Sequence, residues 1–248
     1  MSATTFADLG VSESVRAVLD QRGITTPFPV QQLVLPVAIT GRDVLVSSPT
    51  GSGKTLAFGL PLVERLQRAT RPSALILAPT RELAIQIELE LTPLASARDL
   101  RMAVCYGGTG LENQAAKAAG ADIIVATPGR LIDLARQRRV DLRGVRVLVL
   151  DEADRMLDMG FLPQVKSIVQ QLPTERHTMF FSATLDGQIG QLAAQFTRDA
   201  ERLHPVASPN ETGDPLSARL SQSFLVSTPA TRQEDLLSLI NSEEDLVL

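Results

Sequence analysis

Six short apolar runs, separated by longer segments of mixed polarity, constrain the fold of this chain more than any other feature of its sequence. Short continuous runs of this kind are typical of strands buried in a parallel sheet. They occupy residues 43–47, 74–78, 102–106, 122–126, 145–150 and 178–182. Helical patterns lie between them, among them residues 54–68, 81–95, 111–119 and 189–197. Because strands and helices alternate, we expect an α/β fold with a doubly wound, mainly parallel sheet and helices on both faces.

Composition and length limit the class of protein. The chain has 248 residues, 44% of them hydrophobic and 21% charged, which excludes disordered, collagen-like and coiled-coil proteins. No apolar run approaches the roughly eighteen residues of a membrane span, and residues 1–10 lack the pattern of a secretion signal. A single cysteine, Cys105, and two histidines exclude a disulfide within the chain and a zinc site. We therefore expect a protein of the cytoplasm, with no membrane partner.

Three parts follow one another along the chain. Residues 1–206 carry the whole alternating pattern and are predicted to form one domain. Residues 207–218 are rich in Pro, Gly, Ser and Asn, which indicates a linker. Residues 219–248 contain two strand patterns around one helix pattern, too little for an independent α/β domain, and are predicted to begin a second domain.

A phosphate-binding loop is predicted directly after the first apolar run. Residues 48–55 read SPTGSGKT and lead into a helical pattern. In such a loop the backbone N–H groups hold phosphate oxygens, Lys54 reaches the terminal phosphates and the Thr55 hydroxyl holds Mg²⁺. Gly51 and Gly53 allow a close approach of the backbone. The usual pattern opens with glycine, where this chain has Ser48, so its strict form is not matched.

A pair of acidic residues follows the fifth run. Asp151 at the end of a neighbouring strand is placed to hold the Mg²⁺ through water, and Glu152 to orient or deprotonate an attacking water. Taken alone, residues 151–154 (DEAD) also fit a helix N-terminus in which acids favour the helix dipole. The upstream phosphate loop favours the catalytic interpretation.

With these residues in view, the sequence resembles the DEAD-box ATP-dependent RNA helicases over nearly its whole length. The resemblance rests on ordered motifs: Phe6, GITTPFPVQ at residues 23–31, SPTGSGKT, PTRELA at 79–84, Gly107 with Gly108, TPGR at 127–130, DEAD, and SAT at 182–184. It implies a RecA-like fold of the P-loop NTPase class, ATP and Mg²⁺ as cofactors, and RNA-stimulated hydrolysis of ATP to ADP and phosphate during remodelling of short RNA duplexes.

The resemblance also implies roles for individual residues. Gln31 would read the adenine edge, supported by Phe6, and Ile24 belongs to the same nucleotide-binding segment. The loop residues assigned to the nucleotide are Ser48, Thr50, Gly51, Ser52, Gly53, Lys54 and Thr55. An RNA backbone would follow the loop residues Pro79, Thr80, Arg81, Gly107, Gly108, Thr127, Pro128, Gly129 and Arg130. Asp154, Ser182, Ala183 and Thr184 would couple the nucleotide site to RNA and to a second RecA-like domain, which would also supply a catalytic arginine.

Several positions depart from the family pattern. Ile24 replaces the usual aromatic residue and Phe28 a usual hydroxyl, so weaker adenine packing is expected, and Pro49 provides neither a backbone nor a side-chain donor. The family's HRxGR and RGxD motifs of the second domain do not occur in this sequence. Aromatic residues make up 4%, so contact with the RNA backbone is expected rather than stacking on bases.

Other interpretations stay open at this point. The arginine-rich residues 130–146 fit an RNA surface or a solvated helix face equally beyond Arg130. His177 and His204 are expected to be structural or exposed, Cys105 a small buried side chain, and Pro79 and Pro128 residues that shape turns. The chain could also be an isolated nucleotide- and RNA-binding module with negligible turnover of its own. A GTPase is disfavoured because the NKxD motif is absent.

Overall fold

The computed structural model describes residues 4–49, 51–67, 71–204 and 231. The chain divides into two units, Met1–Val206 and Ala207–Leu248. Apart from Thr231, the described residues belong to the first unit. The predicted linker at residues 207–218 and the predicted start of a second domain at residues 219–248 lie outside the described residues and stay predictions.

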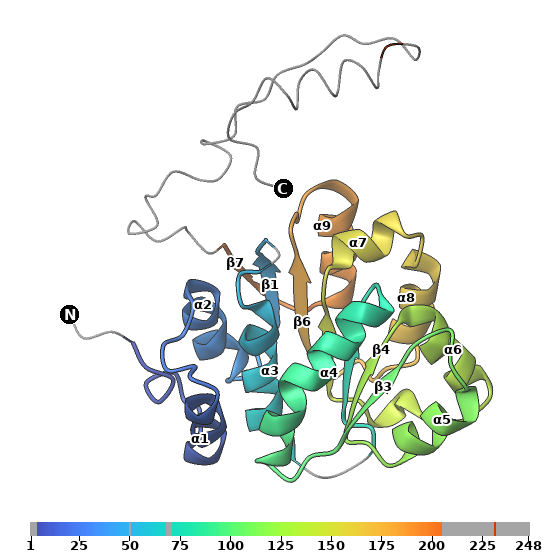
Figure 1. Cartoon of the computed structure of the whole chain (residues 1–248). Helices are drawn as coiled ribbons and strands as arrows, with labels where there is room; N and C mark the ends of the chain where they lie inside the picture. Colours follow the sequence, from blue (N-terminus) through green and yellow to red (C-terminus); the bar gives the residue numbers. More distant parts are fainter. Residues whose placement is uncertain (1–3, 50, 68–70, 205–230, 232–248) are drawn as a thin grey trace. The chain divides into compact units, whose positions relative to one another are not determined.

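Parallel strands form one twisted sheet in the first unit (Figure 1). They are β1 Val44–Ser47, β2 Ala74–Leu77, β3 Met102–Cys105, β4 Ile123–Ala126, β5 Val147–Leu150, β6 His177–Ser182 and β7 Glu201–Leu203. Their order is β3-β4-β2-β5-β6-β1-β7. The six predicted strands are confirmed to within two residues at either end. β7 was not predicted, because an edge strand of three residues, two of them charged, carries no apolar run.

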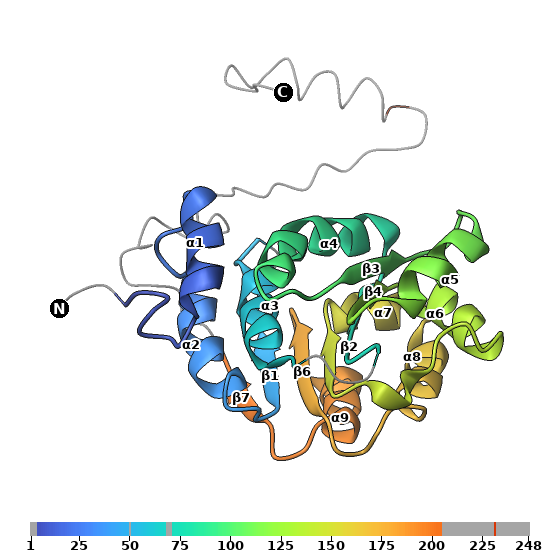
Figure 2. The same ribbon diagram turned by 90° about the horizontal axis from the view of Figure 1, so that it is seen from below.

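Helices cover both faces of this sheet (Figures 1 and 2). They are α1 Glu13–Gln21, α2 Pro29–Ala38, α3 Lys54–Arg65, α4 Arg81–Ser96, α5 Leu111–Ala119, α6 Pro128–Arg136, α7 Ala153–Asp158, α8 Leu162–Val169 and α9 Gly187–Phe196, with a short 3₁₀ turn at Leu142–Gly144. Successive strand residues point to opposite faces: Ile76 packs beneath α1–α4, whereas Leu75 and Leu77 pack beneath α5–α9. The doubly wound α/β fold is confirmed.

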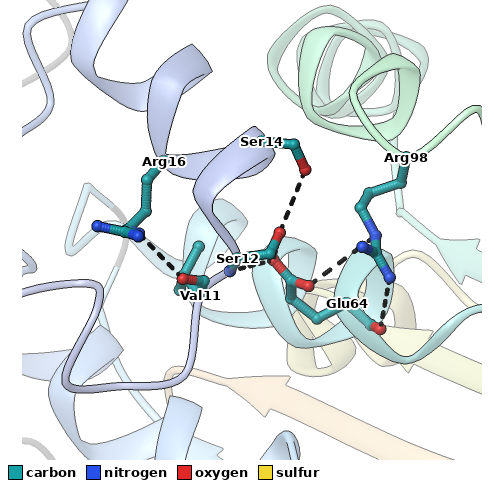
Figure 3. Close-up of polar contacts among 6 residues, drawn as sticks. All are labelled: Val11, Ser12, Ser14, Arg16, Glu64 and Arg98. Atoms are coloured by element: carbon teal, nitrogen blue, oxygen red, sulfur yellow. Dashed lines mark hydrogen bonds and ion pairs between the residues drawn. The ribbon is translucent and has the colours of Figure 1, made fainter.

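A buried carboxylate joins the N-terminal helix to α3, the helix that follows the phosphate loop (Figure 3). The backbone N–H and the hydroxyl of Ser12 both donate to Glu64 Oε1, at 2.8 and 2.7 Å. Glu64 Oε2 lies 3.9 Å from Arg98 Nε, and the Glu64 side chain is only 8% exposed. Ser12 precedes α1, yet its hydroxyl does not cap that helix. It stabilises the contact between α1 and α3 instead.

Candidate functional site

The segment between β1 and α3 has the geometry of a phosphate-binding loop. Gly51 and Gly53 have φ angles of +80° and +87°, a region in which residues with a β-carbon are strained. Lys54 and Thr55 are the first two residues of α3, so the loop ends at a helix N-terminus whose N–H groups and dipole favour an anion. Thr50 lies outside the described residues.

Hydrogen bonds of Ser48 and Ser52 stabilise the start of the loop. Ser48 donates its backbone N–H to the Ser182 carbonyl at 3.0 Å, which continues the pairing of β1 with β6. The Ser48 and Ser52 hydroxyl oxygens lie 2.6 Å apart, and Ser52 Oγ donates to the Pro49 carbonyl at 2.8 Å. Ser48 is buried, so it acts from beneath the loop. Pro49 therefore contributes a carbonyl to the loop's own hydrogen bonds although it has no N–H to offer.

Asp151 follows β5 at the same edge of the sheet. β5 is not next to β1 as predicted, because β6 lies between them, an order set by crossover connections rather than by any local pattern. The Asp151 side chain still lies within electrostatic reach of Lys54. Burial raises the pKa of Asp151 to about 6, a rise opposed by the Lys54 ammonium and increased by the neighbouring Glu152 and Asp154 carboxylates. Ionised Asp151 is therefore a buried charge that the Lys54 ammonium offsets only in part.

Glu152 takes a left-handed backbone conformation, with φ +51° and ψ +53°, at the start of α7. A residue with a β-carbon adopts this region only at a cost in energy, and such strain is often found at functional positions. Its carboxylate is mostly buried and lies 3.3 Å from Arg155 Nη1. The Glu152 N–H donates to Asp151 Oδ1 at 3.0 Å. The two acids are thus held in a fixed relation to each other.

The DEAD and SAT segments are in direct contact. The Ala183 N–H donates to Asp154 Oδ2 at 3.0 Å, and Ser47 Oγ donates to the Ala183 carbonyl at 3.2 Å. Thr184 is exposed. A displacement of either segment would therefore strain or break its hydrogen bonds with the other segment and with the end of β1.

Gln31 connects α2 to the phosphate loop. Its Nε2 donates to the Gly53 carbonyl at 3.1 Å, and its Oε1 accepts from the Phe28 N–H at 2.9 Å. A primary amide has two donor hydrogens and two acceptor lone pairs, so these two contacts use one of each, and the residue is 1% exposed. Phe6 lies in the hydrophobic core and Ile24 packs against it, which fits support of this segment rather than direct contact with a ligand.

The loops predicted to follow RNA emerge from three strands that are adjacent in the sheet, β3, β4 and β2. Pro79, Thr80 and Arg81 follow β2, and Thr80 Oγ1 caps α4 by accepting from the Leu83 N–H at 3.2 Å. Gly107 and Gly108 follow β3. The residues Thr127, Pro128, Gly129 and Arg130 lead from β4 into the first turn of α6. All the predicted RNA residues therefore gather at one end of the sheet edge. The acids follow the next strand, β5, and the phosphate loop follows β1, two strands further along.

Tyr106 and Gln114, which were not predicted from the sequence as site residues, hold these loops together. Arg81 lies over the ring of Tyr106, 4.7 Å from its centroid. Gln114 of α5 is 8% exposed and hydrogen-bonds to Tyr106, Thr109 and Arg130. Gln114 lies with Ala115 and Ala118 on the buried side of α5, where the helical pattern predicts an apolar residue. A glutamine at such a position was the sequence signal that could have identified it.

The remaining singled-out residues have structural environments. Arg139 pairs with Glu112 and Arg143 with Asp141, both at the surface, which favours the solvated-face interpretation of these two arginines. Burial raises the pKa of the Cys105 thiol to about 11, so it stays protonated and inert near neutral pH. Burial lowers the pKa of His177 to about 4, which keeps this buried imidazole neutral, and His204 is exposed.

Two features are absent from the described ranges. No helix there is both long and apolar enough to cross a membrane. Nor do those ranges hold a group of three or more His, Cys, Asp or Glu side chains placed to bind a metal ion by themselves.

Comparisons with known proteins agree with this geometry. The family model described as DEAD/DEAH box helicase matches residues 28–192. The chain is 43% identical over 216 residues to "DEAD-box ATP-dependent RNA helicase 52A" of Oryza sativa subsp. japonica, covering 78% of this chain and 36% of that protein. It is 38% identical over 200 residues to "DEAD-box ATP-dependent RNA helicase CshA" of Streptococcus pneumoniae, covering 80% of this chain and 38% of that protein.

A solved structure is similar as well. The DEAD box protein from the hyperthermophile Methanococcus jannaschii aligns with a TM-score of 0.78 and 31% sequence identity, over 95% of this chain and 63% of that one. The chain thus spans less than half the length of the two curated relatives and less than two thirds of this structure.

Proposed function

Because this chain belongs to the DEAD/DEAH box helicase family, we propose that it is the nucleotide-binding part of an ATP-dependent RNA helicase, which hydrolyses ATP to ADP and phosphate in an RNA-stimulated reaction while remodelling short RNA duplexes. One observation carries the proposal. The phosphate loop, the DEAD acids and the SAT segment are hydrogen-bonded into one unit, at the same sheet edge as the loops after β2, β3 and β4.

On this proposal the nucleotide lies over the start of α3. Lys54 neutralises the terminal phosphates, and the backbone N–H groups of the loop hold their oxygens. The free donor and the free acceptor of Gln31 match the adenine edge, which offers an acceptor and a donor side by side. Glu152 orients the attacking water or accepts its proton, from a position that Arg155 and the Asp151 contact hold in place.

The donor set at the acids fits Mg²⁺. Thr55 offers a hydroxyl and Asp151 a carboxylate, both oxygen ligands. Burial, with a smaller contribution from the Glu152 and Asp154 carboxylates, raises the pKa of Asp151, so a cation there would stabilise its ionised form. When bound, Mg²⁺ would offset the charge that develops on the phosphates. Thr55 and Asp151 would hold it, the latter through water.

RNA would be held by its phosphates. Arg81, Thr127 and Arg130 stand at the starts of α4 and α6, where side-chain donors and helix N-termini both favour phosphate oxygens. Such contacts read no bases, so sequence-independent binding of single-stranded or duplex RNA is proposed. We place the protein in the cytoplasm and expect a second RecA-like domain as its partner in closing on RNA.

A second candidate is a nucleotide- and RNA-binding module with little turnover of its own. It is favoured for residues 1–248 by themselves, because the chain covers under half of its curated relatives and the resemblance assigns a catalytic arginine to a second domain. ATP hydrolysis by residues 1–248, measured with and without single-stranded RNA beside a chain that includes a second RecA-like domain, tests both. Strong RNA-stimulated hydrolysis in the longer chain only is expected, and its absence from both chains would refute the helicase proposal.

A further inference from the structure

The side-chain amide of Gln114 makes four hydrogen bonds at the proposed RNA surface. Oε1 accepts from the Tyr106 N–H at 3.1 Å and from Arg130 Nη1 at 3.0 Å. Nε2 donates to the Tyr106 carbonyl at 3.1 Å and to Thr109 Oγ1. Both lone pairs and both amide hydrogens are therefore occupied. A buried amide satisfied in this way fixes its partners as well as itself.

These contacts connect three loops that come from different strands. Arg130 Nη2 donates to the Thr109 carbonyl at 3.0 Å, so Gln114, Thr109 and Arg130 form a closed set of hydrogen bonds. Tyr106, held at both its N–H and its carbonyl, carries the Arg81 guanidinium on its ring. The segment after β3, the first turn of α6 and the first residue of α4 thus all depend on one side chain of α5.

The arrangement holds Arg130 without using up its donors. A guanidinium has five N–H groups, and the two contacts described above occupy two of them. Gln114 and Thr109 are neutral partners, so the positive charge of Arg130 is not cancelled by this network. The side chain is oriented but still able to donate to a phosphate.

We propose that Gln114 is a positioning residue for RNA: it sets the direction of Arg130 and the shape of the segment from Tyr106 to Thr109 before RNA arrives. This inference rests on the proposed RNA-binding function of the same loops. Gln114 itself need not touch RNA. Its effect comes from preorganisation, since an ordered arginine pays less conformational entropy when a phosphate binds.

The test is RNA affinity of the full 248-residue chain, measured by fluorescence anisotropy with a labelled single-stranded oligonucleotide at several salt concentrations. Gln114→Ala is expected to weaken binding about tenfold, since an unrestrained arginine must lose its conformational entropy when the phosphate binds. The slope of log affinity against log salt should stay nearly unchanged because Arg130 keeps its charge, whereas Arg130→Gln, with one phosphate contact fewer on a single strand, should lower it by about 0.7. Affinity for ATP with Mg²⁺ should stay within about twofold. Asn113→Ala, an exposed amide on the same helix, is the matched control and should change neither.

Two further variants separate positioning from general loosening. Gln114→Glu keeps the acceptor contacts but loses both donor contacts and offsets the charge of Arg130, so its RNA affinity is expected to stay at least as low as that of Gln114→Ala. Arg130→Gln combined with Gln114→Ala should weaken binding by less than the two single effects together, because Gln114 acts in part through Arg130. If Gln114→Ala does not fold, Gln114→Met, which has a similar volume, takes its place.

The outcomes distinguish this inference from the proposed function. An unaltered chain that binds no RNA even at low salt would refute RNA binding by residues 1–248. Normal affinity of Gln114→Ala beside a weakened Arg130→Gln would refute the positioning role alone. Equal losses of RNA and ATP affinity, normal RNA affinity in Gln114→Glu, or additive effects with Arg130→Gln would also refute it.

Discussion

Replacing Asp151 by Asn should stabilise the nucleotide-free protein. The carboxyl has a pKa of about 6 in the folded state, against 3.8 for the ordinary group, so folding raises it by about two units. A folded pKa above the unfolded one means that ionisation at higher pH costs folding free energy, here about 3 kcal/mol at 1.36 kcal/mol per unit. Asn mimics the protonated carboxyl, and its Oδ1 can keep the contact with the Glu152 N–H. The gain should therefore be close to 3 kcal/mol above pH 7.

Urea unfolding of Asp151→Asn and of the unaltered chain between pH 4.5 and 8 measures this effect. The stability difference is expected to be full above pH 7, to shrink as the pH falls through 6, and to be about a third of its full size at pH 4.5. Asp158→Asn, at an exposed aspartate that ends α7, controls for the general effect of removing a negative charge. A variant no more stable than the unaltered chain at pH 8, or a gain that does not change with pH, would show that burial does not raise the pKa of the Asp151 carboxyl.

Three other perturbations follow from the site. Glu152→Gln, in a chain that includes the second domain, should keep ATP and RNA affinity but hydrolyse ATP at least about a hundredfold more slowly, since the amide keeps the shape without the base. Hydrolysis at the parental rate would show that another group activates the water. Gln31→Ala should reduce the preference for ATP over GTP in competition binding, because the adenine-matching donor and acceptor are lost; an unchanged preference would place base selection elsewhere. Ser12→Ala should lower the free energy of unfolding by about 1 kcal/mol through the lost contact with Glu64; equal stability in urea would show that the backbone N–H alone satisfies this carboxylate.

Much of the fold could be predicted from local pattern. Apolar runs buried on both sides have no polar alternation, and this identified six strands, including β1 with the phosphate loop that follows it. Two of the three residues of β7 are charged, so no apolar run marks it, and it is a strand because it pairs with β1. The insertion of β6 between β1 and β5 is a matter of chain crossovers, which no local spacing encodes.

The candidate site was predictable where chemistry and spacing coincide. Lys54, Thr55, Asp151 and Glu152 follow strand ends, so the geometry of a parallel sheet brings them to one edge. Gln114 and Glu64 belong to no such pattern. The partners of Glu64, Ser12 and Arg98, are 52 and 34 residues away in the sequence. In the sequence Gln114 is one more position on an amphipathic helix, and nothing local indicates the partners of its amide. Contacts of this kind depend on tertiary packing.

The central claim is that the loop after β1 binds the phosphates of ATP. Titration calorimetry of residues 1–248 with ATP and Mg²⁺ tests it most directly, beside Lys54→Ala and a control, Lys166→Ala, at an exposed lysine of α8. Measurable binding by the unaltered chain and by Lys166→Ala, together with no detectable binding by a folded Lys54→Ala, is the result that we predict. Equal ATP affinity in a folded Lys54→Ala variant, or no binding by the unaltered chain, would contradict the assignment.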